Sequence, residues 1–168
     1  MASSLKNLSE YSNKNLVDIS RKRFGIVVAE WNNEITEALL DGAYQTLLKN
    51  GAKEKNIFVE SVAGSYELIL GSQWLAQNDK IDAVIVLGCI IQGATRHFDF
   101  IAQAVATGIA DVNLKFNKPV IFGVLTTNDL KQAQERAGGK HGNKGDEAAI
   151  TAIKMIGMKT NLTKNRVW

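Results

Sequence analysis

The residues best suited to chemistry lie in one short stretch, Gln92-Gly-Ala-Thr-Arg-His97, directly after the apolar run Ala83–Ile91. The run is typical of a strand that is buried on both faces. Apolar residues then recur at helical spacing from about residue 96 to residue 116, which predicts a helix. The first amides of a helix have no partners within it, so a small-residue turn leading into them can hold an anion. The sequence therefore predicts an anion site between this strand and this helix.

The side chains of this turn fit both a phosphate and a proton transfer. Gly93 and Ala94 carry little bulk, so a phosphate can approach their backbone, and Thr95 adds a hydroxyl. Arg96 and His97 stand beside the turn. Histidine is the side chain that titrates closest to neutral pH, which makes His97 the best acid–base candidate. The alternative is an ordinary strand–turn–helix corner that Thr95 caps.

The rest of the chain alternates between strands and helices in the same way. Apolar runs predict further strands over 23–30, 56–62 and 118–126, with a short edge strand over 16–20. Helical spacing predicts helices that end near residues 50, 77, 116, 137 and 158. The apolar stripes are expected at Ile35, Leu39, Ala43 and Leu47, at Ile101, Val105, Ile109, Val112 and Phe116, and at Ala149, Ile153 and Ile156.

This alternation predicts an α/β fold. Parallel strands need crossover helices, so we expect a three-layer α-β-α sandwich, flavodoxin-like, around a central, mostly parallel four-stranded sheet. The single domain is expected over 16–158. A flexible N-terminal segment, 1–15, precedes it, and a polar, exposed C-terminal tail, 159–168, follows it.

Composition and motifs exclude several classes of function. The net charge is only +3 and the sequence has no run of Lys or Arg, which argues against nucleic-acid binding. Cys89 is the only cysteine, so an intrachain disulfide and a zinc site built from cysteines are excluded. This cysteine usage suits the reducing cytoplasm, where we expect the protein to be. The longest apolar run, Ala83–Ile91, is far short of the ~18 residues of a membrane span. The glycine-rich segment 138–145 is not a P-loop, and the chain has no dinucleotide-binding glycine motif.

The predicted strands end in residues that suit a planar heterocycle and a phosphorylated partner. In open parallel sheets, ligands bind beyond the carboxyl ends of the strands, where aromatic and polar side chains are expected here. These residues are Trp31, Asn32 and Asn33 after the first strand, Gly64 to Glu67 after the second, Ile91 to His97 after the third, and Thr126 to Asn128 after the fourth.

Structural roles remain open for several candidates. Trp31 can instead close the core at the rim of the sheet, and Glu67 can be a first-turn carboxylate favoured by the helix dipole. Cys89, at the end of a buried strand, is favoured as a small core residue over a nucleophile. Arg136 can be a surface helix residue, and Lys144 can be a loop residue.

Five motifs together resemble the 6,7-dimethyl-8-ribityllumazine synthase family, which catalyses the penultimate step of riboflavin synthesis. They occur in the family's order and at its spacing, over about residues 20–158. The motifs are Phe24–Asn32, Gly64–Leu68, Gly93–Asp99, Pro119–Thr127, and Glu135–Gly138 with Gly142–Gly145.

The resemblance implies a condensation of two small molecules. An amine of 5-amino-6-(D-ribitylamino)uracil attacks the ketone of 3,4-dihydroxy-2-butanone 4-phosphate to give an imine. Phosphate then leaves, and the ring closes with loss of water to form 6,7-dimethyl-8-ribityllumazine. No metal and no redox cofactor is implied.

The resemblance also implies roles for individual residues, with His97 as the proton donor. Trp31 stacks on the uracil ring and Phe122 packs on the heterocycle. The ribitylaminouracil is further held by Ser65, Tyr66, Glu67, Cys89, Ile90 and Ile91. The butanone phosphate is held by Ala94, Thr95 and Arg136, with Asn32, Gly93 and Lys144 as further candidates.

In this family the residues matching Phe122 and Arg136 come from a neighbouring subunit, which implies a homopentamer. The segment 138–145 carries no insertion, which favours an icosahedral shell of sixty subunits, and a riboflavin synthase is the candidate protein partner. Three positions depart from the family pattern: Ala63 and Ile69 stand where proline is frequent, and Gln92 where arginine is common. We expect these differences to affect affinity more than the reaction, with Arg96 as the candidate to compensate for Gln92.

Three other functions are kept as alternatives. The first is a riboflavin synthase of related fold, which needs no phosphate site. The predicted phosphate site at Gly93–Thr95 and Arg136 argues against it. A non-catalytic flavin- or lumazine-binding shell protein keeps Trp31 and Glu67 but has no need of His97. A flavodoxin-like module binds flavin phosphate one to one within a monomer.

Overall fold

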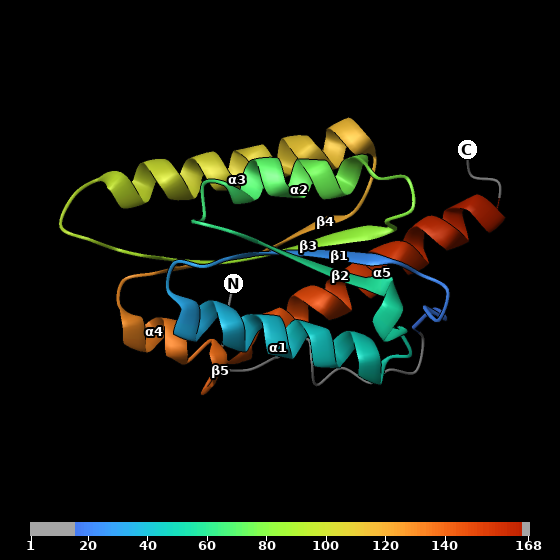
Figure 1. Ribbon diagram of the computed structural model, residues 1–168, viewed down its shortest axis with the longest axis horizontal. Helices are drawn as coiled ribbons and strands as arrows, with labels where there is room; N and C mark the ends of the chain where they lie inside the picture. Colours follow the sequence, from blue (N-terminus) through green and yellow to red (C-terminus); the bar gives the residue numbers. More distant parts are fainter. Residues whose placement is uncertain (1–15, 166–168) are drawn as a thin grey trace.

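Four parallel strands form the centre of the protein (Figure 1). The computed structural model describes residues 16–165. The strand order is β2-β1-β3-β4, and each neighbouring pair is parallel. The strands are β1 (Phe24–Ala29), β2 (Ile57–Val62), β3 (Ala83–Ile91) and β4 (Val120–Thr127).

Helices cover both faces of this sheet. Figure 1 shows α2 and α3 on one face and α1, α4 and α5 on the other. The three layers confirm the α/β fold expected from the sequence. The helices are α1 (Asn33–Lys49), α2 (Leu68–Gln77), α3 (His97–Phe116), α4 (Leu130–Gln134) and α5 (Lys144–Lys164), with a 3-10 turn, η2 (Glu54–Asn56). No helix within residues 16–165 is long and apolar enough to cross a membrane.

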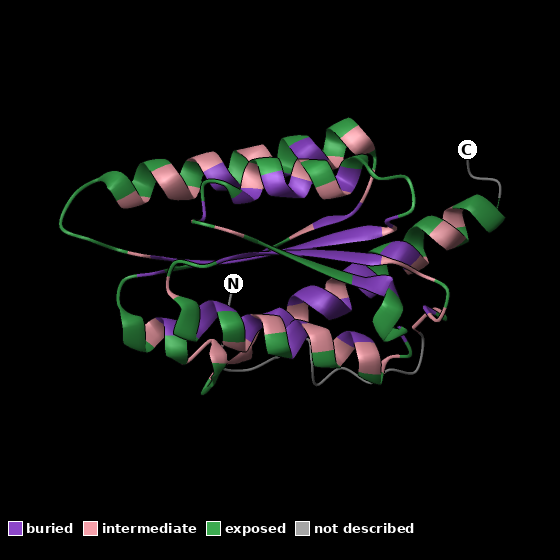
Figure 2. Cartoon of the chain, viewed as in Figure 1, coloured by how far each residue is buried: buried purple, intermediate pink, exposed green. Residues whose placement is uncertain are grey.

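The core lies in two apolar layers, one on each side of β1 and β3 (Figure 2). Every residue of β1 is buried, and so is β3 as far as Ile90. The edge strands β2 and β4 include exposed residues, among them Phe58 and Phe122. The central strands read as continuous apolar runs because helices exclude water from both of their faces.

The predicted helical stripes face these layers. All four stripe residues of α1 are buried, as are Val105, Ile109 and Val112 of α3. Ile101 and Phe116 are partly buried at the margins of the same layer. On α5 the stripe residues Ala149, Ile153 and Ile156 are buried. Each fully buried Leu or Ile contributes about 1.5–3 kcal/mol relative to an exposed side chain, so these stripes fix the helices on the sheet.

The edge strand expected over 16–20 is not formed. Residues 16–19 have no regular structure and a turn follows at Ser20. The Asp18 carboxylate accepts a hydrogen bond from the Ser20 amide at 2.9 Å, and the Lys22 amide donates to the Ile19 carbonyl at 2.9 Å. These local bonds take the place of ladder bonds to a neighbouring strand. Ile19 is nevertheless buried, because the segment packs across the first apolar layer.

Helix α5 continues past the end expected near residue 158. Asn143 caps its start, because the Asn143 side-chain oxygen accepts the Gly145 amide at 2.8 Å. Its last turns extend to Lys164, through much of the segment expected to be a polar tail. The expectations for residues 1–15 and 166–168 lie outside the described residues.

Helices α1 and α5 approach each other closely at two glycines. A Cβ atom on Gly145 would lie 1.9 Å from the Leu39 carbonyl oxygen, and one on Gly42 would lie 2.5 Å from the Asn143 side chain. The side-chain amide of Asn143 also donates to the Ala38 carbonyl at 2.8 Å. The start of α5 is therefore fixed against the backbone of α1.

We expect Gly145→Ala to destabilise the fold by about 3 kcal/mol, because the new methyl group would overlap a backbone oxygen that cannot move alone. Gly157→Ala, in the same helix, is the matched control, since its Cβ would meet Val17 at an ordinary 3.5 Å. The control should gain about 0.5–1 kcal/mol of helix propensity. Urea unfolding at one protein concentration measures both, and equal midpoints would contradict the packing argument.

Candidate active site

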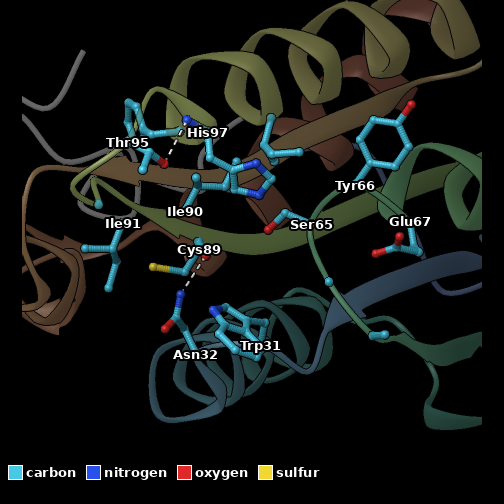
Figure 3. Close-up of a pocket in the computed structure, with 15 residues that line it drawn as sticks. Trp31, Asn32, Ser65, Tyr66, Glu67, Cys89, Ile90, Ile91, Thr95 and His97 are labelled. Atoms are coloured by element: carbon cyan, nitrogen blue, oxygen red, sulfur yellow. Dashed lines mark hydrogen bonds between the residues drawn. The ribbon is translucent and has the colours of Figure 1, made fainter.

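A pocket of about 690 Å³ opens at the carboxyl ends of β1, β2 and β3 (Figure 3). It brings together twelve of the candidate residues drawn from the sequence, contributed by three separate loops and the end of β3. These are Trp31, Asn32, Gly64, Ser65, Tyr66, Glu67, Cys89, Ile90, Ile91, Gly93, Thr95 and His97. The ends of parallel strands meet at one edge of a sheet, which explains why positions so distant in sequence converge.

Asn32 joins the loop after β1 to the end of β3. Its side-chain amide donates to the Cys89 carbonyl at 2.9 Å (Figure 3), and its backbone is left-handed, with a φ of 62°. The same residue occupies the cap position of α1, but its side chain does not cap the helix. The Trp31 amide donates to the Ala63 carbonyl at 3.1 Å and so ties this loop to the one after β2.

Aromatic side chains stand exposed at the rim of the pocket. Trp31 is 72% exposed, and Tyr66 is also exposed. The alternative in which Trp31 closes the core is therefore wrong for this chain. An exposed indole at the rim offers a flat apolar face on which a ring can stack.

The floor of the pocket is buried and apolar. Cys89 is only 1% exposed, and Ser65 and Ile90 are buried beside it. Burial raises the pKa of the Cys89 thiol to about 11, because a thiolate would lose its hydration there. Cys89 is thus a neutral core side chain, as favoured from the sequence, whose carbonyl is engaged by Asn32.

The turn before α3 forms the opposite wall. Residues 92–97 are all exposed, and the Gln92 amide donates to the Thr127 carbonyl at 2.8 Å, which ties the turn to β4. The Thr95 hydroxyl accepts the His97 amide at 3.4 Å, but Arg96 occupies the cap position of α3 and no side chain caps the helix, so the alternative of a corner capped by Thr95 is not formed. The His97 side chain lines the pocket (Figure 3). This wall joins a helix N-terminus, small residues and an imidazole, a combination that can bind an anion and move a proton.

Three residues of this turn, Gln92, Ala94 and Arg96, do not line the pocket. Ala94 is exposed between Gly93 and Thr95 but does not line the cavity. The Arg96 guanidinium lies 3.4 Å from the Asp99 carboxylate and 5.8 Å from the centre of the Phe100 ring. Arg96 therefore points along the outside of α3, and not into the pocket where it could replace the charge absent at Gln92.

Phe122, Arg136 and Lys144 line a second groove, also of about 690 Å³, between β4 and α5. Phe122 is 42% exposed on the edge strand. The Arg136 guanidinium donates to the Gln132 carbonyl at 2.9 Å, and the Lys144 ammonium pairs with the Glu147 carboxylate. Within one chain these three residues do not meet the first pocket.

Sequence reasoning missed part of the pocket wall. Phe98 and Ile101 line it from the first turns of α3, and Ala63 lines it from the loop after β2. Ile101 was expected only as a core residue, and the signal that could have placed it was its position one turn after His97. Within residues 16–165, no three His, Cys, Asp or Glu side chains gather as metal ligands would.

The fold and pocket define a doubly wound α/β protein with a pocket at the carboxyl ends of its strands, where proteins of this class bind ligands. The model of the family described as 6,7-dimethyl-8-ribityllumazine synthase matches residues 21–160. A relative of that name from Cytophaga hutchinsonii is 64% identical over 93% of this chain and 98% of its own. Another, from Phocaeicola vulgatus, is 50% identical over 100% of both chains. The chain belongs to this family of enzymes, which confirms the resemblance drawn from its motifs.

The buried thiol of Cys89 gives a direct test of the pocket floor. At pH 8 the folded protein should react with iodoacetamide about a hundredfold more slowly than the unfolded protein, because so little of the buried thiol is ionised. The rate should rise with pH towards the raised pKa of about 11. The same reaction in urea is the control, and rapid labelling of the folded protein at pH 8 would show that the floor is open.

Proposed function

We propose that this protein condenses 5-amino-6-(D-ribitylamino)uracil with 3,4-dihydroxy-2-butanone 4-phosphate to form 6,7-dimethyl-8-ribityllumazine. The observation that carries the proposal is the meeting of Trp31, Glu67 and His97 in one pocket beside the N-terminus of α3. The uracil needs a ring to stack on and a carboxylate to accept its hydrogen bonds. The butanone phosphate needs an anion-binding turn, and the reaction needs a proton donor. Family membership supports the same reaction.

The uracil is assigned to the side of the pocket formed by the loops after β1 and β2. Trp31 supplies the stacking face, and Glu67 supplies a carboxylate that accepts hydrogen bonds from ring N–H or ribityl hydroxyl groups. Ser65, Tyr66 and the strand end Cys89–Ile91 line the same space. The buried floor favours a planar heterocycle, because it offers apolar area to one face of the ring.

The phosphate of the second substrate is assigned to the turn before α3. Gly93 and Thr95 line the pocket there, and the dipole of α3, which is 20 residues long, favours a negative charge at its N-terminus. Ala94 lies between them and contributes its backbone. Such a site holds the phosphate near His97, with the ketone directed at the uracil's amine.

The reaction then follows from the positions of these groups. The amine nitrogen attacks the ketone carbon, and protonation of the resulting hydroxyl lets water leave as the imine forms. Loss of the proton on C3 then expels phosphate, which carries away the electrons of its C–O bond, and leaves an enol. The enol tautomerises to a ketone at C3. The second amine attacks this new carbonyl, and a second water leaves as the ring closes. His97 is the group placed to give and take these protons.

Phe122, Arg136 and Lys144 are assigned to the same site in a neighbouring subunit. Their groove lies on the exposed edge strand β4, away from the first pocket of the same chain. In a ring of copies, the second groove of each subunit lies against the first pocket of its neighbour. Such a ring completes the active site, as in the homopentamer implied by the family. The proposal extends to a shell of sixty subunits, a riboflavin synthase partner and a cytoplasmic location.

The reaction is tested by mixing the purified protein with both substrates and following the fluorescent lumazine. His97→Ala should lower kcat by about a hundredfold or more, because general acid–base catalysis is lost. It should leave the KM for the butanone phosphate nearly unchanged, since the phosphate site is intact. Thr107→Ala, farther along α3, is the control. Equal turnover in His97→Ala would remove His97 from the mechanism, and tight lumazine binding without any turnover would favour the non-catalytic shell protein.

Arg136→Ala should raise the KM for the butanone phosphate by about tenfold or more, because a charge-assisted contact to phosphate is lost. The KM for the uracil should change much less. Lys131→Ala removes another cation close by, exposed on α4, and should affect neither value. A comparable rise in both KM values for Arg136→Ala would refute the phosphate assignment.

A further inference from the structure

A short hairpin lies between the two cationic residues of the second groove, Arg136 and Lys144. Its strands are β5 (Ala137–Gly139) and β6 (Gly142–Asn143), so Arg136 directly precedes the hairpin and Lys144 directly follows it. The Lys144 amide donates to the Arg136 carbonyl at 2.9 Å. The two side chains line the same groove, and the hairpin therefore sets their spacing.

The base of this hairpin is held firmly, whereas its tip has little regular pairing. Asn143 fastens the base to α1 through its bond to the Ala38 carbonyl. Towards the tip, the pairing register shifts between Ala137 and Gly139. Gly138 and Gly142 both adopt positive φ values, of 114° and 71°. Glycines in a two-strand hairpin leave much conformational freedom, so the tip needs another contact to hold one shape.

His141 provides that contact. Its amide donates to the Glu135 carbonyl at 2.7 Å, and its Nε2 atom lies 3.7 Å from the Glu135 carboxylate. The side chain is only 15% exposed, and its Nδ1 atom is buried without a hydrogen-bond partner among the described residues. A histidine that was merely solvated would keep both nitrogens in water, whereas this imidazole is largely withdrawn from solvent beside Glu135.

We propose that His141 is a positioning residue for the phosphorylated substrate. By closing the hairpin tip onto Glu135, the residue directly before Arg136, it steadies the backbone from which the Arg136 and Lys144 side chains extend into the groove. A site whose cations are already in place loses less conformational freedom on binding, which favours affinity. This inference rests on the proposed function, because it takes the butanone phosphate as the anion that the two cations bind.

The test compares His141→Ala with two matched variants in steady-state assays with both substrates. His141→Ala should raise the KM for the butanone phosphate about threefold to tenfold, the effect of losing one side-chain contact to Glu135 while the backbone bond remains. The KM for the uracil and kcat should stay near their wild-type values. His141→Gln keeps a nitrogen donor that can reach Glu135 and should restore most of the affinity. Lys140→Ala removes an exposed charge from the same tip and should have no effect.

Hydrogen exchange of the Lys144 amide tests the same inference without any activity. This amide should exchange faster in His141→Ala than in the wild type and return towards the wild-type rate in His141→Gln. An unchanged exchange rate, or an unchanged KM in an active enzyme, would overturn the positioning role alone. A wild-type protein that forms no lumazine would overturn the proposed function, whatever the exchange of the hairpin.

Discussion

Parallel pairing between β1 and β3 is the constraint on which the rest of the structure depends. The two strands run side by side from Phe24 opposite Ala83 to Val28 opposite Leu87. The chain leaves β1 for α1 on one face of the sheet and leaves β3 for α3 on the other (Figure 1). The loops after both strands emerge at the same edge and then diverge. The pocket is the space between them, so its place is set by topology before any side chain is chosen.

The pocket combines a rigid floor with an accessible rim. Cys89 and Ile90 belong to the two apolar layers on either side of the sheet, so the same burial that stabilises the fold also holds the pocket floor in place. Trp31 and Tyr66 stand in solvent above it. Their exposure costs stability in an isolated chain, whereas contact with a flat ligand or another subunit would recover it.

Most of the fold could be predicted because apolar periodicity reports burial. The run Ala83–Ile91 is β3 to the residue, and the stripe on α1 is fully buried. The expected strand over 16–20 failed because a local bond from the Ser20 amide to Asp18 competes with pairing, and an apolar pattern does not register such bonds. The loops of the first pocket were found because topology gathers strand ends. Whether Phe122 joins that pocket could not be worked out from one chain's periodicity, since such a contact depends on a second copy.

Asn32 shows how narrowly one position can be specified. Its backbone is left-handed, a conformation that asparagine and glycine adopt more readily than other residues, and its side-chain amide donates to the Cys89 carbonyl. Glycine would accept the backbone but lose the donor. Aspartate would turn a negative oxygen towards a carbonyl oxygen, and leucine or valine would meet both obstacles. Of these residues only asparagine satisfies the two demands together, so the geometry of the loop, rather than the chemistry of any ligand, already restricts which side chains this position tolerates.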